Sequence, residues 1–177
     1  MRKVISVYGS ALTAREHPDY AAGVAVGHAL AQAGFSVMTG GYDGLMGAIS
    51  QGANEAGGHV IGITSATIEK IRPAKANMWV REVIHYMTLH ERLLHLITRA
   101  DGYVAMPGGL GTLNELVMVW ELMRVNEIPH NPIVCYGDYW REILTPFYGA
   151  RYMPANAPTL HFAHTPQEVV AVLQGGG

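Results

Sequence analysis

The chain has 177 residues, of which 49% are hydrophobic and 15% are charged, and its formal net charge is −2. This length suffices for one domain with a sizeable core. The small net charge argues against a non-specific nucleic-acid binder and against a polybasic membrane surface. Cys135 is the only cysteine, which excludes an intrachain disulfide and leaves a cysteine-based zinc site without support.

Short apolar runs alternate along the chain with longer helical patterns. The first half predicts, in order, a strand at Lys3–Tyr8, a helix at Tyr20–Ala33, a strand at Phe35–Thr39, a helix at Leu45–Ala56 and a strand at His59–Ile63. The second half predicts a strand at Trp79–His85, a helix at Leu89–Arg99, a strand at Gly102–Ala105, a helix at Gly111–Arg124, a strand at Pro132–Tyr136 and helices at Tyr139–Tyr148 and Pro166–Leu173. We expect Ser65–Asn77 to be irregular and His161 and His164 to lie in a loop.

Such an alternation predicts an α/β fold, in which helices cover both faces of a parallel sheet. No linker or low-complexity segment divides the chain, so we expect residues 1–177 to form a single domain with a flexible tail at 174–177. In folds of this kind ligands bind outside the carboxyl ends of the strands. The loops that lead from strands into helices are therefore where function is to be sought.

Two such loops are rich in glycine: TGGYDGLMG at 39–47 and MPGGLGTLNE at 106–115. Glycines there allow backbone N–H groups to converge on an anion at the positive end of a helix, although such turns can also serve only tight packing. Neither G-x-G-x-x-G nor a Walker pattern occurs, which favours a nucleoside monophosphate or sugar phosphate over NAD or ATP. The candidate phosphate-binding residues are Gly9, Ser10, Gly40, Gly41, Gly44, Met46, Gly108, Gly109, Leu110, Gly111 and Thr112.

Glu115 is the chemical candidate beside the second loop. It follows Gly111 by four residues and Thr112 by three, so the three share one helix face. Its carboxylate is thereby expected about one helical turn, ~5 Å, from the phosphate site. That is comparable to the separation of a 5′-phosphate and the ribose C1′. The alternative is an acid favoured only by the helix dipole, by ~0.3–1 kcal/mol, which would not account for the two loops.

Arg92 is the second candidate, because it borders the apolar face formed by Leu89, Leu93, Leu96 and Ile97. An arginine in such a place usually has a carboxylate or phosphate partner. The alternative is an arginine whose stem covers the edge of the core while its head reaches solvent.

A metal centre is not expected. His85, His90 and His95 are five residues apart, which turns them ~140° from one another on a helix. Cys135 ends an apolar run and is typical of a small buried hydrophobe. The sequence therefore predicts neither a metal ion nor another cofactor.

The segment MRKVISVYGS has an apolar run too short for a signal peptide, and no run reaches the ~18 apolar residues of a membrane helix. We expect a soluble, cytoplasmic protein with no membrane or nucleic-acid partner. A homodimer is expected for another reason: at about 100° per residue, the apolar positions of Leu113–Val125 cover nearly the whole helix circumference. The same helix of a second copy would cover them, unless Ser65–Asn77 of the same chain does.

Residues 40–47, Arg92 and the P-G-G-x-G-T-x-x-E motif at 107–115 resemble the LOG ("lonely guy") family, whose members are often labelled possible lysine decarboxylases. The resemblance runs from about Val4 to Leu173. It implies a Rossmann-like, doubly wound fold, a dimer, and a phosphoribohydrolase that releases the base of a nucleoside 5′-monophosphate such as a cytokinin ribotide or AMP. The family's catalytic glutamate and arginine match Glu115 and Arg92. Where the family often has Arg-Lys, this chain has Arg92-Leu93, a difference that bears on the substrate more than on the fold.

Three functions remain open from the sequence. The first is hydrolysis of an N-glycosidic bond, in which Glu115 stabilises charge at C1′ and Arg92 holds phosphate or positions Glu115. The second is a non-catalytic nucleotide- or molybdenum-cofactor-binding protein, and the third is a structural dimer. A lysine decarboxylase is disfavoured, because pyridoxal phosphate needs a Schiff-base lysine and the lysines, at 3, 70 and 75, lie in neither glycine-rich loop.

Overall fold

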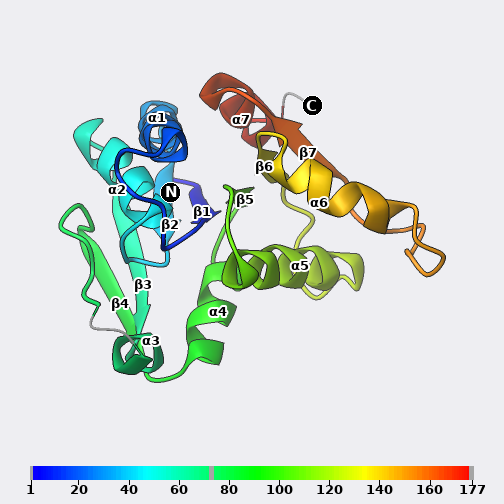
Figure 1. The fold of residues 1–177 in the computed structure, drawn as a ribbon, viewed down its shortest axis with the longest axis horizontal. Helices are drawn as coiled ribbons and strands as arrows, with labels where there is room; N and C mark the ends of the chain where they lie inside the picture. Colours follow the sequence, from blue (N-terminus) through cyan, green and yellow to red (C-terminus); the bar gives the residue numbers. More distant parts are fainter. Residues whose placement is uncertain (1, 72–73, 176–177) are drawn as a thin grey trace.

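The computed structural model describes residues 2–71 and 74–175 (Figure 1). Within them, seven parallel strands form one sheet in the order β4-β3-β2-β1-β5-β6-β7. The strands are β1 (Val4–Tyr8), β2 (Ser36–Thr39), β3 (Val60–Ser65), β4 (Glu82–Tyr86), β5 (Gly102–Ala105), β6 (Ile133–Tyr136) and β7 (Leu160–Ala163). The predicted parallel α/β architecture is confirmed.

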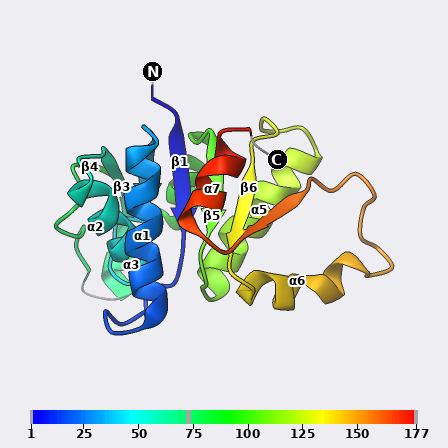
Figure 2. The same ribbon diagram turned by 90° about the horizontal axis from the view of Figure 1, so that it is seen from above.

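Helices cover both faces of this sheet. They are α1 (Pro18–Gln32), α2 (Leu45–Glu55), α3 (Ala66–Ile71), α4 (Leu89–Thr98), α5 (Leu110–Arg124), α6 (Tyr139–Tyr148) and α7 (Pro166–Leu173). Figure 1 shows α1, α2 and α7 on one face, with α4 and α5 on the other. Figure 2 shows α6 and the segment after it extending away from the rest of the molecule.

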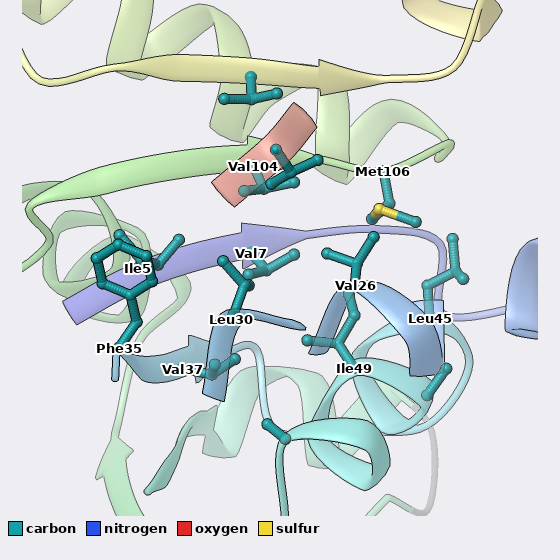
Figure 3. Close-up of a cluster of buried hydrophobic side chains, with 14 of the residues drawn as sticks. Ile5, Val7, Val26, Leu30, Phe35, Val37, Leu45, Ile49, Val104 and Met106 are labelled. Carbon is teal, nitrogen blue, oxygen red and sulfur yellow. The ribbon is translucent and has the colours of Figure 1, made fainter. Parts of the chain in front are cut away.

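Alternation along the strands divides the core between the two faces. Ile5 and Val7 of β1 pack with side chains of α1 and α2, as Figure 3 shows, whereas Tyr8 belongs to the cluster beneath α4 and α5. Because successive strand residues point to opposite faces, a strand with helices on both sides must be apolar on both. This requirement explains the continuous apolar runs in the sequence.

The direction of winding reverses beside β1. The chain runs from β1 through β2 and β3 to β4 at one edge, and then returns to β5 on the other side of β1. The register pairs Val7 with both Thr39 and Val104, so β1, β2 and β5 end at nearly the same level. Their following loops therefore meet at the topological switch point, where α/β sheets bind ligands.

Two expectations about individual elements were wrong. The segment with His161 contains β7, which pairs with β6 and includes the partly buried Phe162. The part of Ser65–Asn77 that follows β3 forms the single short helix α3. Both elements are short, and each is stabilised by contacts with distant parts of the chain.

The predicted tail lies partly outside the described residues, which end at Gly175. The N–H of Gln174 donates to the carbonyl of Val170, and that of Gly175 donates to the carbonyl of Val172. These two residues thus close the carboxyl end of α7. In the part of the chain that the structure describes, no helix is both long and apolar enough to cross a membrane.

Candidate active site

A hollow of about 260 Å³ lies at the switch point, beyond the carboxyl ends of β1, β2 and β5. Its walls come from the loops after these strands, from α3 and from the first turns of α4 and α5. The lining residues are Gly9, Ser10, Ala11, Leu12, Tyr42, Met46, Ile68, Arg92, Gly109, Gly111, Thr112 and Glu115.

Backbone hydrogen bonds of Ser10 join the two glycine-rich loops. Its N–H donates to the carbonyl of Pro107 at 3.0 Å, and its carbonyl accepts from the N–H of Leu45 at 2.8 Å. This approach needs glycine at position 44, where φ is +69° and a Cβ atom would lie 2.4 Å from the Ser10 oxygen. The loops after β1, β2 and β5 consequently form one connected wall.

The amino end of α5 faces this hollow without a side-chain cap. Gly109 is the N-cap residue, and a glycine supplies no acceptor for the first N–H groups of the helix. Thr112, which is buried, packs so closely on Gly108 that a Cβ atom there would lie 2.2 Å from the Thr112 Oγ1. Free N–H groups, a hydroxyl and the positive end of the helix dipole together suit a phosphate.

The start of α4 places Arg92. A capping box fixes that start, because Thr88 Oγ1 accepts from the N–H of Glu91 and the Glu91 carboxylate accepts from the N–H of Thr88. One residue later, Arg92 donates from Nε to the carbonyl of Ile63 at 2.8 Å and from Nη2 to that of Gly40 at 3.2 Å. The guanidinium is thus held against the ends of β2 and β3.

Glu115 lies opposite this guanidinium, with its Oε1 at 3.7 Å from the Arg92 Nη1. The two side chains are only 13% and 8% exposed. Burial raises the pKa of Glu115 to about 7, and the nearby Arg92 charge opposes that rise. A carboxyl group whose pKa lies near neutrality can both stabilise positive charge and exchange a proton with water.

Most of the predicted site residues are brought together here. Eight of them line the hollow: Gly9, Ser10, Met46, Arg92, Gly109, Gly111, Thr112 and Glu115. Gly40, Gly41, Gly44 and Gly108 are buried behind its surface and act through the backbone or through close packing. Leu110 does not point inward, because its side chain is 84% exposed; only its backbone belongs to the start of α5.

Four lining residues were not among the predicted ones: Ala11, Leu12, Tyr42 and Ile68. Tyr42 lies inside the first glycine-rich segment, which was a signal available in the sequence. Its hydroxyl accepts from the N–H of Ser65 and donates to the carbonyl of the same residue, and the Arg92 guanidinium lies 5.8 Å from its ring centre. Ile68 belongs to α3, so its place required the tertiary structure.

Leu93 does not line the hollow. It is 9% exposed and packs with Leu96 and Ile97 in the core beneath α4. Leu93 is therefore a core residue whose side chain takes no part in the wall of the hollow. Across 2–71 and 74–175, no three histidine, cysteine or acidic side chains gather closely enough to hold a metal ion.

Comparison with known proteins identifies related sequences and structures. A model of the family described as "Possible lysine decarboxylase" matches residues 46–173. A cytokinin riboside 5′-monophosphate phosphoribohydrolase, LOG5 of Arabidopsis thaliana, is 37% identical over 111 residues, which are 62% of this chain and 47% of that protein. The chain belongs to the LOG family.

A second LOG relative matches a longer part of the chain at lower identity. A protein of Oryza sativa subsp. japonica named as a probable cytokinin riboside 5′-monophosphate phosphoribohydrolase, LOGL2, is 31% identical over 152 residues, or 78% of this chain and 58% of the relative. The matched part of the chain spans about half the length of these curated LOG relatives.

Solved structures share the fold across nearly the whole chain. A molybdenum cofactor binding protein from the phototrophic bacterium Rippkaea orientalis superposes with a TM-score of 0.75 at 22% identity, covering 99% of this chain and 97% of that one. The molybdenum cofactor carrier protein of Chlamydomonas reinhardtii gives 0.74 at 22% identity, covering 99% and 98%. At this identity the likeness establishes the fold that this LOG-family chain shares with them.

Proposed function

We propose that the protein hydrolyses the N-glycosidic bond of a nucleoside 5′-monophosphate, a cytokinin ribotide or AMP-like compound, to free base and ribose 5-phosphate. The observation that carries this proposal is the buried Glu115–Arg92 pair, 3.7 Å apart, in the same hollow as the uncapped amino end of α5. The Glu115–Arg92 pair is suited to charge stabilisation and proton exchange, and the amino end of α5 is suited to phosphate binding. The curated LOG relatives named as phosphoribohydrolases support the same reaction.

The phosphate would bind at the start of α5, to the backbone of Gly109 and Gly111 and the hydroxyl of Thr112. Glu115 stands about one helical turn, ~5 Å, further along that helix. This separation brings its carboxylate to the ribose C1′ of a nucleotide whose 5′-phosphate occupies the loop. Leu12, Tyr42, Met46 and Ile68 would then border the sugar and the base.

In the reaction, the bond from C1′ to the base nitrogen breaks and positive charge develops on the ribose. The Glu115 carboxylate stabilises that charge and takes a proton from the attacking water, whose oxygen forms the new bond to C1′. The base leaves with the bonding electron pair and takes up the proton that Glu115 received from the water, which returns Glu115 to its carboxylate form. Arg92, held by two backbone carbonyls, positions Glu115 and favours its ionised form.

The residues that line this hollow do not fit the decarboxylase activity named in the family description. Pyridoxal-dependent decarboxylation requires a lysine at the cofactor. None of Lys3, Lys70 and Lys75, all within the described residues, lines it. The proposed hydrolysis relies on residues that do line the hollow: Arg92, Thr112 and Glu115 through their side chains, and Gly109 and Gly111 through their backbone.

Incubation of the purified protein with a panel of nucleoside 5′-monophosphates tests the proposal. Release of free base together with an equal amount of ribose 5-phosphate is the expected result, and the matching nucleosides without phosphate serve as the control. Binding of a monophosphate without release of base would instead support a non-catalytic nucleotide-binding protein. Absence of both would contradict the proposed site.

The proposed role of Glu115 predicts a pH dependence. Because its pKa is raised to about 7 and the carboxylate is the active form, kcat/KM should increase with pH through an inflection near 7. In the Arg92→Met variant the inflection should lie at higher pH, because the Arg92 charge lowers the Glu115 pKa. The substrate phosphate titrates at about 6 in both proteins, so the shift between them isolates the enzyme group. An inflection unmoved by the substitution would contradict the assignment.

We also propose that the protein forms a homodimer through α5. Trp120 and Met123 are buried within the chain itself: the Trp120 ring contacts Phe147 and Tyr148, and its Nε1 donates to the carbonyl of Pro158. The segment from α6 to Pro158 therefore covers this part of α5. Val117 remains 41% exposed beside an apolar hollow of about 200 Å³. A second copy packed there would remove this apolar surface from water.

Light scattering at low micromolar concentration should give twice the 19.2 kDa mass of one chain. The Val117→Asp variant should give the mass of a single chain, because a buried charge without a partner opposes association. A matched variant, Glu127→Gln, alters an exposed residue beyond α5 and should leave the mass at the dimer value. A wild-type mass near 19.2 kDa would contradict the dimer.

A further inference from the structure

Three consecutive carbonyls of the loop after β5 accept hydrogen bonds from donors outside that loop. The indole Nε1 of Trp140 donates to the carbonyl of Met106 at 2.9 Å, and the N–H of Ser10 donates to that of Pro107 at 3.0 Å. The hydroxyl of Tyr139 donates to the carbonyl of Gly108 at 2.7 Å. Two of these three donors belong to the first two residues of α6, which is not otherwise part of the candidate site.

The Tyr139 hydrogen bond controls the direction of one backbone N–H. In a trans peptide the carbonyl of one residue and the N–H of the next point in opposite directions. With the Gly108 carbonyl turned toward Tyr139, the N–H of Gly109 points away from Tyr139. Gly109 lines the hollow and is the N-cap of α5, so this group is one of those available to a phosphate.

The peptide between Gly108 and Gly109 particularly needs such an anchor. Glycines on both sides lack the Cβ atoms that would restrict its rotation, so their φ and ψ angles have unusual freedom. A reversed peptide would direct the carbonyl oxygen, with its partial negative charge, toward the place of the N–H. An oxygen in that position would repel a phosphate instead of binding it.

The anchor itself is rigidly placed. Trp140 is 1% exposed, and its ring meets that of Tyr139 edge-on at 5.0 Å. The turn before α6 is tied to β7, because the N–H of Gly137 donates to the carbonyl of Ala163 at 2.8 Å. Tyr139 itself is 41% exposed, so removal of its hydroxyl leaves the core intact.

We propose that Tyr139 is a positioning residue for phosphate binding, whose hydroxyl holds the Gly108–Gly109 peptide with its N–H available to the ligand. This inference rests on the proposed function only in placing the phosphate at the start of α5. Trp140 acts as the second anchor by holding the Met106 carbonyl at the beginning of the same loop. Neither side chain takes part in the bond-breaking step.

The test compares Tyr139→Phe with wild-type protein in calorimetric titrations with ribose 5-phosphate and, separately, with adenosine. Ribose 5-phosphate has no glycosidic base to lose, so its binding is measured independently of hydrolysis. Loss of one hydrogen bond should weaken ribose 5-phosphate binding about 5- to 10-fold. Adenosine binding should stay within about twofold of wild type. In turnover of nucleoside monophosphates, KM should rise while kcat changes little.

Tyr86→Phe is the matched control, since it also removes a partly buried hydroxyl contact, the one at 2.8 Å to His95 Nδ1, away from the phosphate loop. It should leave ribose 5-phosphate affinity unchanged. Equal weakening of adenosine and ribose 5-phosphate by Tyr139→Phe would indicate a general structural effect and overturn the proposal, as would unchanged ribose 5-phosphate affinity. Wild-type protein that binds ribose 5-phosphate but releases no base would contradict the hydrolase proposal alone, and the Tyr139→Phe titration would still decide the positioning role.

Discussion

Replacement of Glu115 by glutamine should lower kcat about 10²- to 10³-fold, because the amide cannot stabilise positive charge at C1′ or accept a proton from water. Ribose 5-phosphate should still bind, since the amino end of α5 and Thr112 are unchanged. The measurement is the rate of base release, with ligand affinity determined on the same preparation. Near-wild-type turnover would remove Glu115 from the mechanism.

The pH dependence of the unfolding temperature is a separate test of the Glu115→Gln variant. Because the pKa of Glu115 is raised to about 7 in the folded protein, the folded state binds more protons than the unfolded one between about 4.5 and 7. This group therefore makes the wild type less stable as pH rises through that interval, and the glutamine variant lacks this contribution. The unfolding temperature of the variant minus that of the wild type should therefore be at least as high at pH 8 as at pH 5. Glu127→Gln, at an exposed site, controls for loss of charge alone.

Replacement of Arg92 by methionine should lower kcat/KM by about 10²-fold, as expected for loss of a charged group that positions the catalytic centre. The substitution removes the cation beside Glu115 and leaves the carbonyls of Ile63 and Gly40 without their donor. Steady-state kinetics with a nucleoside 5′-monophosphate measures the effect. Arg99→Met, which removes an exposed cation at the end of the same helix, should have kinetics close to wild type.

Gly40→Ala gives an independent test of the same arrangement with Arg92 still present. A methyl group there would lie 2.0 Å from the Arg92 Nη2 and 2.6 Å from the Met46 sulfur, so the guanidinium must move. Activity should fall toward that of Arg92→Met. If Gly40→Ala kept full activity, the position of the guanidinium would not matter, and Arg92 would be reduced to a packing residue.

The two elements that sequence reasoning missed show where local patterns lose information. β7 is four residues long, and its pairing with β6 joins segments separated by the whole of α6 and the following loop. α3 is six residues long and has no buried side chain, so it carries no amphipathic pattern. The strands β2, β5 and β6 are equally short, but β7 differs from them by the histidine at its second position, and α3 is too short to show a helical period.

Apart from α3 and β7, local sequence was sufficient for the alternation of strands and helices, the two glycine-rich loops and the helix that carries Glu115. These features depend on neighbours along the chain: apolar periodicity, glycine at strand-to-helix turns, and the spacing of Thr112 and Glu115 on one helix face. The motif at 107–115 added the family, which the comparisons confirm.

The tertiary structure alone decided what these groups contact. Arg92 finds its acceptors 29 and 52 residues away, and Tyr139 finds the Gly108 carbonyl 31 residues away. Burial, which sets the Glu115 pKa near 7, depends on several loops at once, and the same packing places Leu93 in the core instead of the hollow. Hydrogen bonds and desolvation depend on distances in space. These distances are set only when the sheet brings the ends of β1, β2 and β5 together.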